Sequence, residues 1–349
     1  MAGSGAISAT SRRNKMDKKL RIEDLTVEIK NQNNYYKALD GISFQAEEGE
    51  IVGLVGESGC GKSLSSLAIM RLLPQAARVS AGCICLGDTD LLKLSEEEMC
   101  GVRGADISMI FQEPMTALNP LITVGKQIEE AYLLHHPGEK RNAGVKAKEM
   151  MKKVGLSRVE KLYREYPHQL SGGMKQRIVI AMALINHPKL IVADEPTTAL
   201  DVTIQYQILE LLRELNKEFK STILFISHDL GVVKELCSRI IVMYAGNIVE
   251  EGSTEEILHN PMHPYTKGLL ESIPTPQKKG EILYNIPGIV EPLTKRSQTG
   301  CVFAKRCPNA KAECQTQKPE MQKTEGRRVS CLELDGKEKL PEECKRVSA

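Results

Sequence analysis

One short stretch of the chain contains residues able to bind a nucleoside triphosphate. The residues from Gly56 to Ser63 read Gly-Glu-Ser-Gly-Cys-Gly-Lys-Ser, which is the spacing G-x-x-x-x-G-K-S. An apolar run, Ile51–Val55, predicts a buried strand before it, and Leu64–Leu73 predicts a helix after it. Glycines let successive backbone N–H groups point at one anion, and a helix N-terminus favours negative charge. This combination predicts a phosphate-binding loop.

The side chains of this loop predict how a triphosphate would be held. Lys62 can reach the β- and γ-phosphates, and the hydroxyl of Ser63 can hold Mg²⁺. We therefore expect ATP as the ligand, with Mg²⁺ as its metal ion. The residues expected around the phosphates are Gly56, Ser58, Gly59, Cys60, Gly61, Lys62, Ser63 and Leu64.

Two further apolar strands end in residues suited to a metal ion and a water molecule. Leu190–Asp194 is followed by Glu195, and a second run from Ile223 ends at His228. Ligands of parallel sheets bind beyond the carboxyl ends of the strands, so we expect these side chains near the loop. Asp194 could hold Mg²⁺ through water, and Glu195 could orient or deprotonate water. A purely structural histidine is the alternative for His228.

The segment ahead of the loop predicts an antiparallel sheet. Leu20–Ile29 and Ala38–Ala46 both alternate as strands do, with turn signals after them. The polar stretch 31–36 between them is predicted to be a loop. Its Tyr35 and Tyr36 could stack on an adenine ring or could be ordinary loop tyrosines. From 122 to 185 the periodicity is helical, which predicts a helical insertion between strand-bearing stretches.

In these motifs the chain resembles the ATP-binding cassette (ABC) family of transport ATPases over about residues 20–258. Leu170-Ser171-Gly172-Gly173 is similar to the signature motif of that family. Gln112 stands where its Q-loop glutamine belongs, and Asp201 and His228 stand at its D-loop and switch positions. The resemblance implies an α/β fold with a P-loop core sheet, an antiparallel β subdomain and an inserted helical subdomain.

The resemblance also implies a mechanism. Two cassettes stack head to tail, with ATP between the phosphate loop of one and Ser171, Gly172 and Gly173 of the other. It implies that Gln112 and Asp194 complete the surroundings of Mg²⁺, that Glu195 polarises the attacking water, and that His228 contacts the γ-phosphate. Asp201 would connect the two sites. The family places its adenine-stacking aromatic nearer Ile29, so Tyr35 or Tyr36 would be a substitute here.

A narrower resemblance covers nearly the whole chain and concerns the ATPase subunits of dipeptide and oligopeptide importers. It rests on Phe111–Pro120, Glu195–Gln205 and His263–Pro274, and Thr197-Thr198 with Thr203 is more similar to the D-type subunit. This implies a second, paralogous ATPase subunit, two transmembrane permease subunits and an extracytoplasmic peptide-binding protein. Nickel importers share these stretches and are the alternative substrate class.

These patterns together divide the chain into four parts. Many prolines after Asn260 preclude long helices there. The predicted parts are a flexible leader (1–17), an ATP-binding core with the β subdomain (18–110 and 189–258), a helical subdomain with the Q-loop and signature motif (111–188) and a small irregular Cys-rich C-terminal domain (259–349).

Four cysteines in the C-terminal part could hold a metal. Cys301, Cys307, Cys314 and Cys331 are separated by 5, 6 and 16 residues. Four thiolates suit a [4Fe–4S] cluster or tetrahedral zinc, and four reduced cysteines without metal are the third possibility. Some members of the peptide-importer group carry an iron–sulfur cluster on a similar pattern, so the resemblance favours the cluster.

Composition limits the remaining function classes. Charged residues make up 26% of the chain and the formal net charge is +2, so bulk charge predicts no nucleic-acid partner. No apolar run approaches the length of a membrane-spanning helix, and we expect a peripheral protein at the cytoplasmic face of the membrane. The competing hypotheses are a soluble, non-transport ABC ATPase and a redox-sensing binding module.

Overall fold

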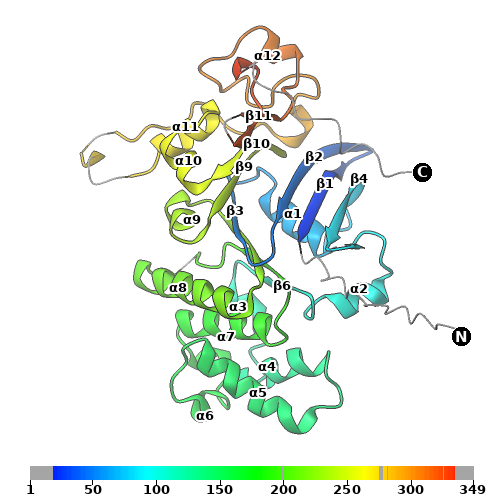
Figure 1. The fold of residues 1–349 in the computed structure, drawn as a ribbon, viewed down its shortest axis with the longest axis vertical. Coiled ribbons are helices and arrows are strands. Elements are labelled where there is room, and N and C mark those ends of the chain that lie inside the picture. The colour runs from blue at the N-terminus through cyan, green and yellow to red at the C-terminus, as the bar shows by residue number, and fades with distance from the viewer. Residues whose placement is uncertain (1–18, 199, 275–277, 281, 325, 335–349) are drawn as a thin grey trace, which may run out of the picture.

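The computed structural model describes residues 19–198, 200–274, 278–280, 282–324 and 326–334 (Figure 1). The predicted leader, residues 1–17, lies outside the described residues. The chain forms an α/β fold with two sheets, as predicted. Among the described residues, no helix is long and apolar enough to cross a membrane.

The larger sheet has the strand order β11-β12-β10-β9-β3-β8-β7-β6. Its central strands are parallel and almost completely buried, which explains their continuous apolar sequences. The strands of this sheet are β3 (Ile51–Val55), β6 (Ile107–Ile110), β7 (Leu190–Asp194), β8 (Thr222–Ser227), β9 (Arg239–Tyr244), β10 (Asn247–Ser253), β11 (Gln322–Thr324) and β12 (Arg327–Val329).

The pleat of the larger sheet divides its side chains between two hydrophobic cores. In β3, Val52 and Leu54 join the core shared with the smaller sheet and helix α1 (Lys62–Ile69). Ile51 and Val55 join the core shared with the helices of the insertion. Side chains of a strand alternate between faces, so the same five residues connect both layers. The phosphate loop therefore begins at the end of a strand whose two faces are both packed in hydrophobic cores.

The smaller sheet is antiparallel, with the order β2-β1-β4-β5, and it confirms the predicted pairing ahead of the loop. Its strands are β1 (Leu20–Asn31), β2 (Asn34–Ala46), β4 (Ala77–Leu86) and β5 (Thr89–Asp90). The predicted loop at 31–36 was wrong. Asn31 pairs with Asn34, and Gln32 takes a left-handed conformation (φ 55°), so a two-residue turn closes the hairpin. Tyr35 and Tyr36 consequently lie in β2, where aromatic residues are favoured.

Figure 1 shows helices α4 to α7 at one end of the molecule and the C-terminal segment around α12 at the opposite end. The bounds are α2 (Glu96–Val102), α3 (Pro114–Ala117), α4 (Val124–Leu133), α5 (Lys140–Lys153), α6 (Val159–Leu162), α7 (Gly172–Leu184), α8 (Val202–Phe219), α9 (Leu230–Leu236), α10 (Thr254–His259), α11 (Pro264–Glu271) and α12 (Glu313–Thr316). Short 3₁₀ turns are η1 (Pro167–Gln169), η3 (Leu293–Lys295) and η4 (Leu332–Leu334).

The C-terminal residues pair with the larger sheet and share its hydrophobic core. Strand β12 pairs with β10 through Glu250 and Val329, so the β11–β12 hairpin extends the larger sheet. Tyr265 and Phe303 lie in the same hydrophobic core as the sheet and the helical insertion. No strand period is visible in this part of the chain, because β11 and β12 have only three residues each. A separate Cys-rich domain is therefore not confirmed.

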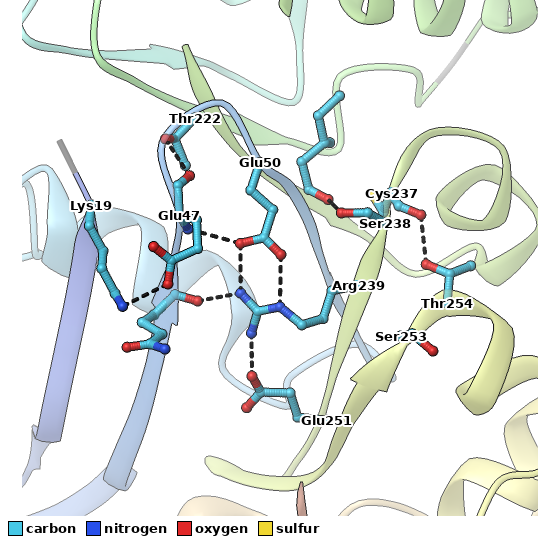
Figure 2. A network of polar contacts seen from close by, with 12 residues as sticks. Lys19, Glu47, Glu50, Thr222, Cys237, Ser238, Arg239, Glu251, Ser253 and Thr254 are labelled. Carbon is cyan, nitrogen blue, oxygen red and sulfur yellow. Dashed lines mark hydrogen bonds and ion pairs between the residues drawn. The ribbon is translucent and has the colours of Figure 1, made fainter. Parts of the chain in front are cut away.

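One half-buried arginine connects strands from both sheets. Figure 2 shows Arg239, at the start of β9, between Glu50 and Glu251. Its Nε and Nη2 lie 2.8 and 2.9 Å from the two carboxylate oxygens of Glu50, and Nη1 pairs with Glu251. Nη2 also donates to the carbonyl of Gln45 in β2, at 2.6 Å. All three charged side chains are at most one-fifth exposed.

Replacing Arg239 with Ala should lower the free energy of unfolding by about 3 kcal/mol, because the partly buried Glu50 loses its two-pronged arginine partner and Glu251 keeps only Arg328. Denaturant unfolding of the full chain measures this. Arg78→Ala is the matched control, since it removes an exposed pair with Glu28 and should cost less than about 1 kcal/mol. Equal losses in the two variants would contradict the structural role of Arg239.

Candidate nucleotide site

The phosphate loop connects β3 to α1 and is closely packed from outside. A side chain at Gly56 would come within 2.2 Å of the carbonyl oxygen of Met243, and Gly61 has a φ of 113° that other residues rarely adopt. Glycine is therefore required at both positions. The loop turns directly into the N-terminus of α1, which begins at Lys62. This places the backbone N–H groups of the loop and helix toward one anion site.

Lys62 is folded back over the loop. Its Nζ donates to the carbonyls of Gly56 at 2.7 Å and Glu57 at 3.1 Å, and its side chain is buried. The ammonium group is thus held at the loop, where an incoming phosphate would exchange with these carbonyls. Cys60 is also buried, and burial raises the pKa of its thiol.

The predicted Mg²⁺ residues of the loop and of β7 are in direct contact. The hydroxyl of Ser63 donates to Oδ1 of Asp194 at 3.2 Å, and Ser66 donates to Oδ2 at 3.2 Å. Burial raises the pKa of Asp194. A cation would reverse that effect by favouring the ionised carboxylate, and carboxylate and hydroxyl oxygens are ligands that Mg²⁺ prefers. These residues therefore fit Mg²⁺. Sequence reasoning missed Ser66, whose position inside a helix gives no motif signal.

Three side chains from different parts of the chain contact the carboxylate of Glu195. Gln112 Nε2 donates to its Oε2 at 2.9 Å, Thr198 Oγ1 donates to the same oxygen at 3.0 Å, and His228 Nδ1 lies 3.0 Å from Oε1. Glu195 has a φ of 47°, which is uncommon for a residue other than glycine and is typical of functional sites. The structure thus brings together the predicted Glu195, Gln112 and His228, and adds Thr198.

The signature residues occupy a helix start elsewhere in the molecule. Ser171 is the N-cap of α7, and its hydroxyl accepts from the N–H of Met174 at 3.4 Å. A side chain on Gly173 would lie 2.8 Å from Ile204 in α8, so glycine permits close helix packing. Asp201 is the N-cap of α8 and accepts from the N–H of Ile204 at 3.0 Å. The signature motif and the D-loop are therefore adjacent to one another.

The two tyrosines proposed for adenine differ in their surroundings. Tyr36 lies directly across from Ile29, and Tyr35 lies across from Lys30. Directly opposed residues of an antiparallel pair point to the same face, so Tyr36 shares the face of Ile29. The guanidinium of Arg78 lies 3.7 Å from the ring centre of Tyr35 and covers one side of it.

The four C-terminal cysteines lie close enough to influence one another. The N–H of Cys301 donates to the carbonyl of Cys314 at 2.8 Å. Burial, and to a smaller extent the charges of Cys314, Cys331 and Cys307, raise the pKa of Cys301 to about 11. In the described part of the chain, however, no group of three or more His, Cys, Asp or Glu residues is arranged to hold a metal ion. The structure therefore does not support the predicted iron–sulfur site.

The fold and this site define an ATP-binding cassette ATPase. The ABC transporter family matches residues 39–198, and the C-terminal region of oligopeptide/dipeptide transporters matches residues 249–314. The dimeric, post-hydrolysis structure of the cassette MJ0796 bound to ADP and Pi aligns with a TM-score of 0.60. It is 30% identical, and the alignment covers 67% of this chain and 98% of that one.

Relatives specify the group within that class. The oligopeptide transport ATP-binding protein AppD of Bacillus subtilis (strain 168) is 47% identical over 88% of this chain and 96% of its own length. The dipeptide transport ATP-binding protein DppD of Escherichia coli (strain K12) is 45% identical over 89% of this chain and 95% of its own. The chain therefore belongs to the family of ATP-binding proteins of oligopeptide and dipeptide transporters, and it hydrolyses ATP.

Proposed function

We propose that this chain is the D-type ATPase subunit that powers import of dipeptides or oligopeptides. The observation that carries the proposal is Glu195 at the end of β7, next to the Ser63–Asp194 pair and in contact with Gln112 and His228. This arrangement places a carboxylate for water beside a metal-binding hydroxyl. Relatives at 45–47% identity are named for peptide transport, which favours peptides over nickel.

In the proposed reaction each side chain has a separate role. Lys62 would bind the β- and γ-phosphates, while Ser63, the amide oxygen of Gln112 and, through water, Asp194 would hold Mg²⁺. When bound, the ion would supply positive charge against the charge that develops on the phosphates. Glu195 orients and deprotonates the attacking water, and His228 contacts the γ-phosphate. Gln112 can contact both Glu195 and Mg²⁺, because its Nε2 donates to Glu195 while its amide oxygen is a separate atom that can bind the ion.

ATP hydrolysis requires two cassettes in this proposal. Ser171, Gly172 and Gly173 supply the start of α7 to the γ-phosphate bound at the phosphate loop of a partner cassette. Asp201, adjacent to the start of α7, would connect the two ATP sites across the dimer. For adenine we choose Tyr36, because it occupies the face of Ile29, whereas Arg78 already covers Tyr35.

The proposed assembly contains a second, paralogous ATPase subunit, two transmembrane permeases and an extracytoplasmic peptide-binding protein. The chain would sit at the cytoplasmic face of the membrane. The helical segment 111–188 begins next to Gln112, so a permease helix seated there could move the glutamine that contacts Glu195. The ATP-binding core would then comprise residues 18–110 and 189–258.

Affinity purification of the tagged chain from native membranes tests the assembly. The proposal expects two polytopic membrane proteins and a second cassette in stoichiometric amounts. Recovery with ribosomes or DNA, without membrane subunits, would instead support a soluble, non-transport ABC ATPase.

Apart from the nucleotide site, we propose a [4Fe–4S] cluster on Cys301, Cys307, Cys314 and Cys331 from their spacing and the family resemblance alone, since the described residues show no grouping arranged to hold a metal ion. All four cysteines are free and partly exposed, and the N–H of Cys301 donates to the carbonyl of Cys314 at 2.8 Å, so at least these two are neighbours. Protein purified without oxygen should contain about four iron and four sulfide per chain, and Cys307→Ser should lose both. Cys100→Ser, an exposed cysteine outside the group, is the control. Zinc, or no metal, in the unaltered protein would reject the cluster.

A further inference from the structure

The C-terminal region reaches back to the outer side of the phosphate loop. Arg306 forms a two-pronged ion pair with Glu57, the second residue of the loop. Nη1 lies 2.6 Å from Oε2, and Nη2 lies 3.1 Å from Oε1. Almost 250 residues separate the two partners in the sequence, so no local pattern predicts this contact. Parallel, charge-assisted hydrogen bonds of this kind are strong and fix geometry.

The ion pair is held in a largely buried setting. The side chain of Arg306 is 7% exposed and that of Glu57 is 28% exposed. Arg306 also donates to the carbonyls of Pro287 at 2.9 Å and Ile286 at 3.3 Å, and to the hydroxyl of Tyr244 at 3.3 Å. Five donor contacts therefore fix the guanidinium. The hydrogen bond with Glu57, the largest influence, raises the pKa of Arg306, which stays charged.

Aromatic residues connect the same segment to the loop backbone. The hydroxyl of Tyr265 accepts from the N–H of Glu57 at 2.9 Å. The rings of Tyr265, Tyr244 and Phe303 pack edge to face, with centres 4.7 to 5.4 Å apart. All three are almost completely buried. The loop therefore rests on a rigid aromatic support that belongs partly to the C-terminal region.

A second guanidinium reaches the other side of the loop. Arg296 donates to the carbonyl of Gly59 at 3.0 Å and to that of Ala38 at 3.4 Å. The carbonyl of Cys60 accepts from the N–H of Gly246 at 2.7 Å. The carbonyls of Gly59 and Cys60 are thus bonded to groups outside the loop, which fixes the path of the loop backbone around the anion site.

We propose that Arg306 is a positioning residue: it neutralises the charge of Glu57 and holds the phosphate loop in the conformation that binds ATP. The inference rests on the proposed nucleotide site and concerns residues that never touch the nucleotide. Glu57 carries a negative charge within the loop that must accept a polyanionic triphosphate. Without Arg306, the negative charge of Glu57 would repel the phosphates. The binding of ATP would also have to order a loop that Arg306 no longer holds in place.

The proposal predicts opposite behaviour for the two partners. Arg306→Ala leaves the Glu57 carboxylate uncompensated, and the affinity for ATP should fall about tenfold. Glu57→Gln removes the negative charge but keeps an oxygen that can accept from Arg306. Its affinity should therefore stay within about threefold of the unaltered protein or become tighter. The double variant should recover most of the affinity lost in Arg306→Ala.

Titration of the full chain with a fluorescent ATP analogue, mant-ATP, in the presence of Mg²⁺ measures these affinities. Arg328→Ala is the control, because Arg328 is another C-terminal arginine paired with a carboxylate, Glu251, away from the loop. It should not change the affinity. A higher ionic strength should reduce the defect of Arg306→Ala, because salt screens the repulsion.

Two results would overturn the proposal. One is a folded Arg306→Ala protein that binds mant-ATP as tightly as the unaltered chain. The other is a double variant that binds no better than Arg306→Ala, which would make the role purely structural. If Arg306→Ala does not fold, weaker binding by Glu57→Gln overturns it equally. Failure of the nucleotide site itself is distinguishable, because the unaltered chain would then not bind mant-ATP at all.

Discussion

Glu195→Gln should lower the steady-state rate of ATP hydrolysis by about 10²–10⁴-fold, the usual contribution of a general base. Gln112, Thr198 and His228 contact the two oxygens of Glu195, which fixes the carboxylate relative to the Ser63–Asp194 pair that we propose as the Mg²⁺ site. The amide retains this shape but cannot accept a proton from water. ATP should still bind, so the variant should accumulate an ATP-bound dimer.

Phosphate release from the assembled transporter and size-exclusion chromatography with ATP measure the two parts of this expectation. Glu149→Gln, an exposed carboxylate on α5, is the matched control and should hydrolyse ATP normally. Full activity of Glu195→Gln would remove Glu195 from the chemistry. Loss of ATP binding by this variant would instead show that Glu195 has a structural role in the nucleotide site.

Lys62→Ala should fail at an earlier step, with nucleotide affinity reduced about 100-fold or more, because charge-assisted contacts to two phosphates are lost. The ammonium is already held at the carbonyls of Gly56 and Glu57, so little ordering is required when ATP enters. Equilibrium binding of mant-ATP tests this directly. The fold should remain intact, since the loop is supported from outside by Tyr265 and Arg306.

Lys126→Ala, on α4, is the control because its side chain is 62% exposed and far along the chain from the loop. Unchanged nucleotide affinity in Lys62→Ala would contradict the phosphate assignment. The two variants together separate binding from chemistry: Lys62→Ala should not bind ATP, and Glu195→Gln should bind but not hydrolyse it.

Sequence reasoning located those parts of the site whose chemistry requires fixed spacing. Gly56 leaves no room for a side chain and Gly61 has a backbone conformation that favours glycine. Asp194 ends a buried strand and Glu195 follows it. The types and positions of these residues could therefore be predicted from the sequence. Thr198 belongs to no spacing that predicts chemistry, and its contact with Glu195 depends on the local turn in which the N–H of Thr198 donates to the carbonyl of Glu195. The whole set of functional roles remains a prediction that the variants above test.

Contacts between distant segments could not be read in this way. Arg306 reaches Glu57 only because the C-terminal region packs on the core, and β11 and β12 are too short to show a strand period. Tyr36 was placed in a loop because polar residues surround it, although the tight turn at Gln32 continues the strand. Tertiary packing determined the first outcome, and a tight local turn determined the second.

The most direct test of the central claim is ATP-dependent uptake of a labelled peptide by vesicles that contain the complete transporter. The account predicts peptide accumulation that requires internal ATP, this chain and the extracytoplasmic binding protein, and that is lost in Glu195→Gln. Uptake of nickel without peptide uptake, or peptide uptake that continues with Glu195→Gln, would contradict it.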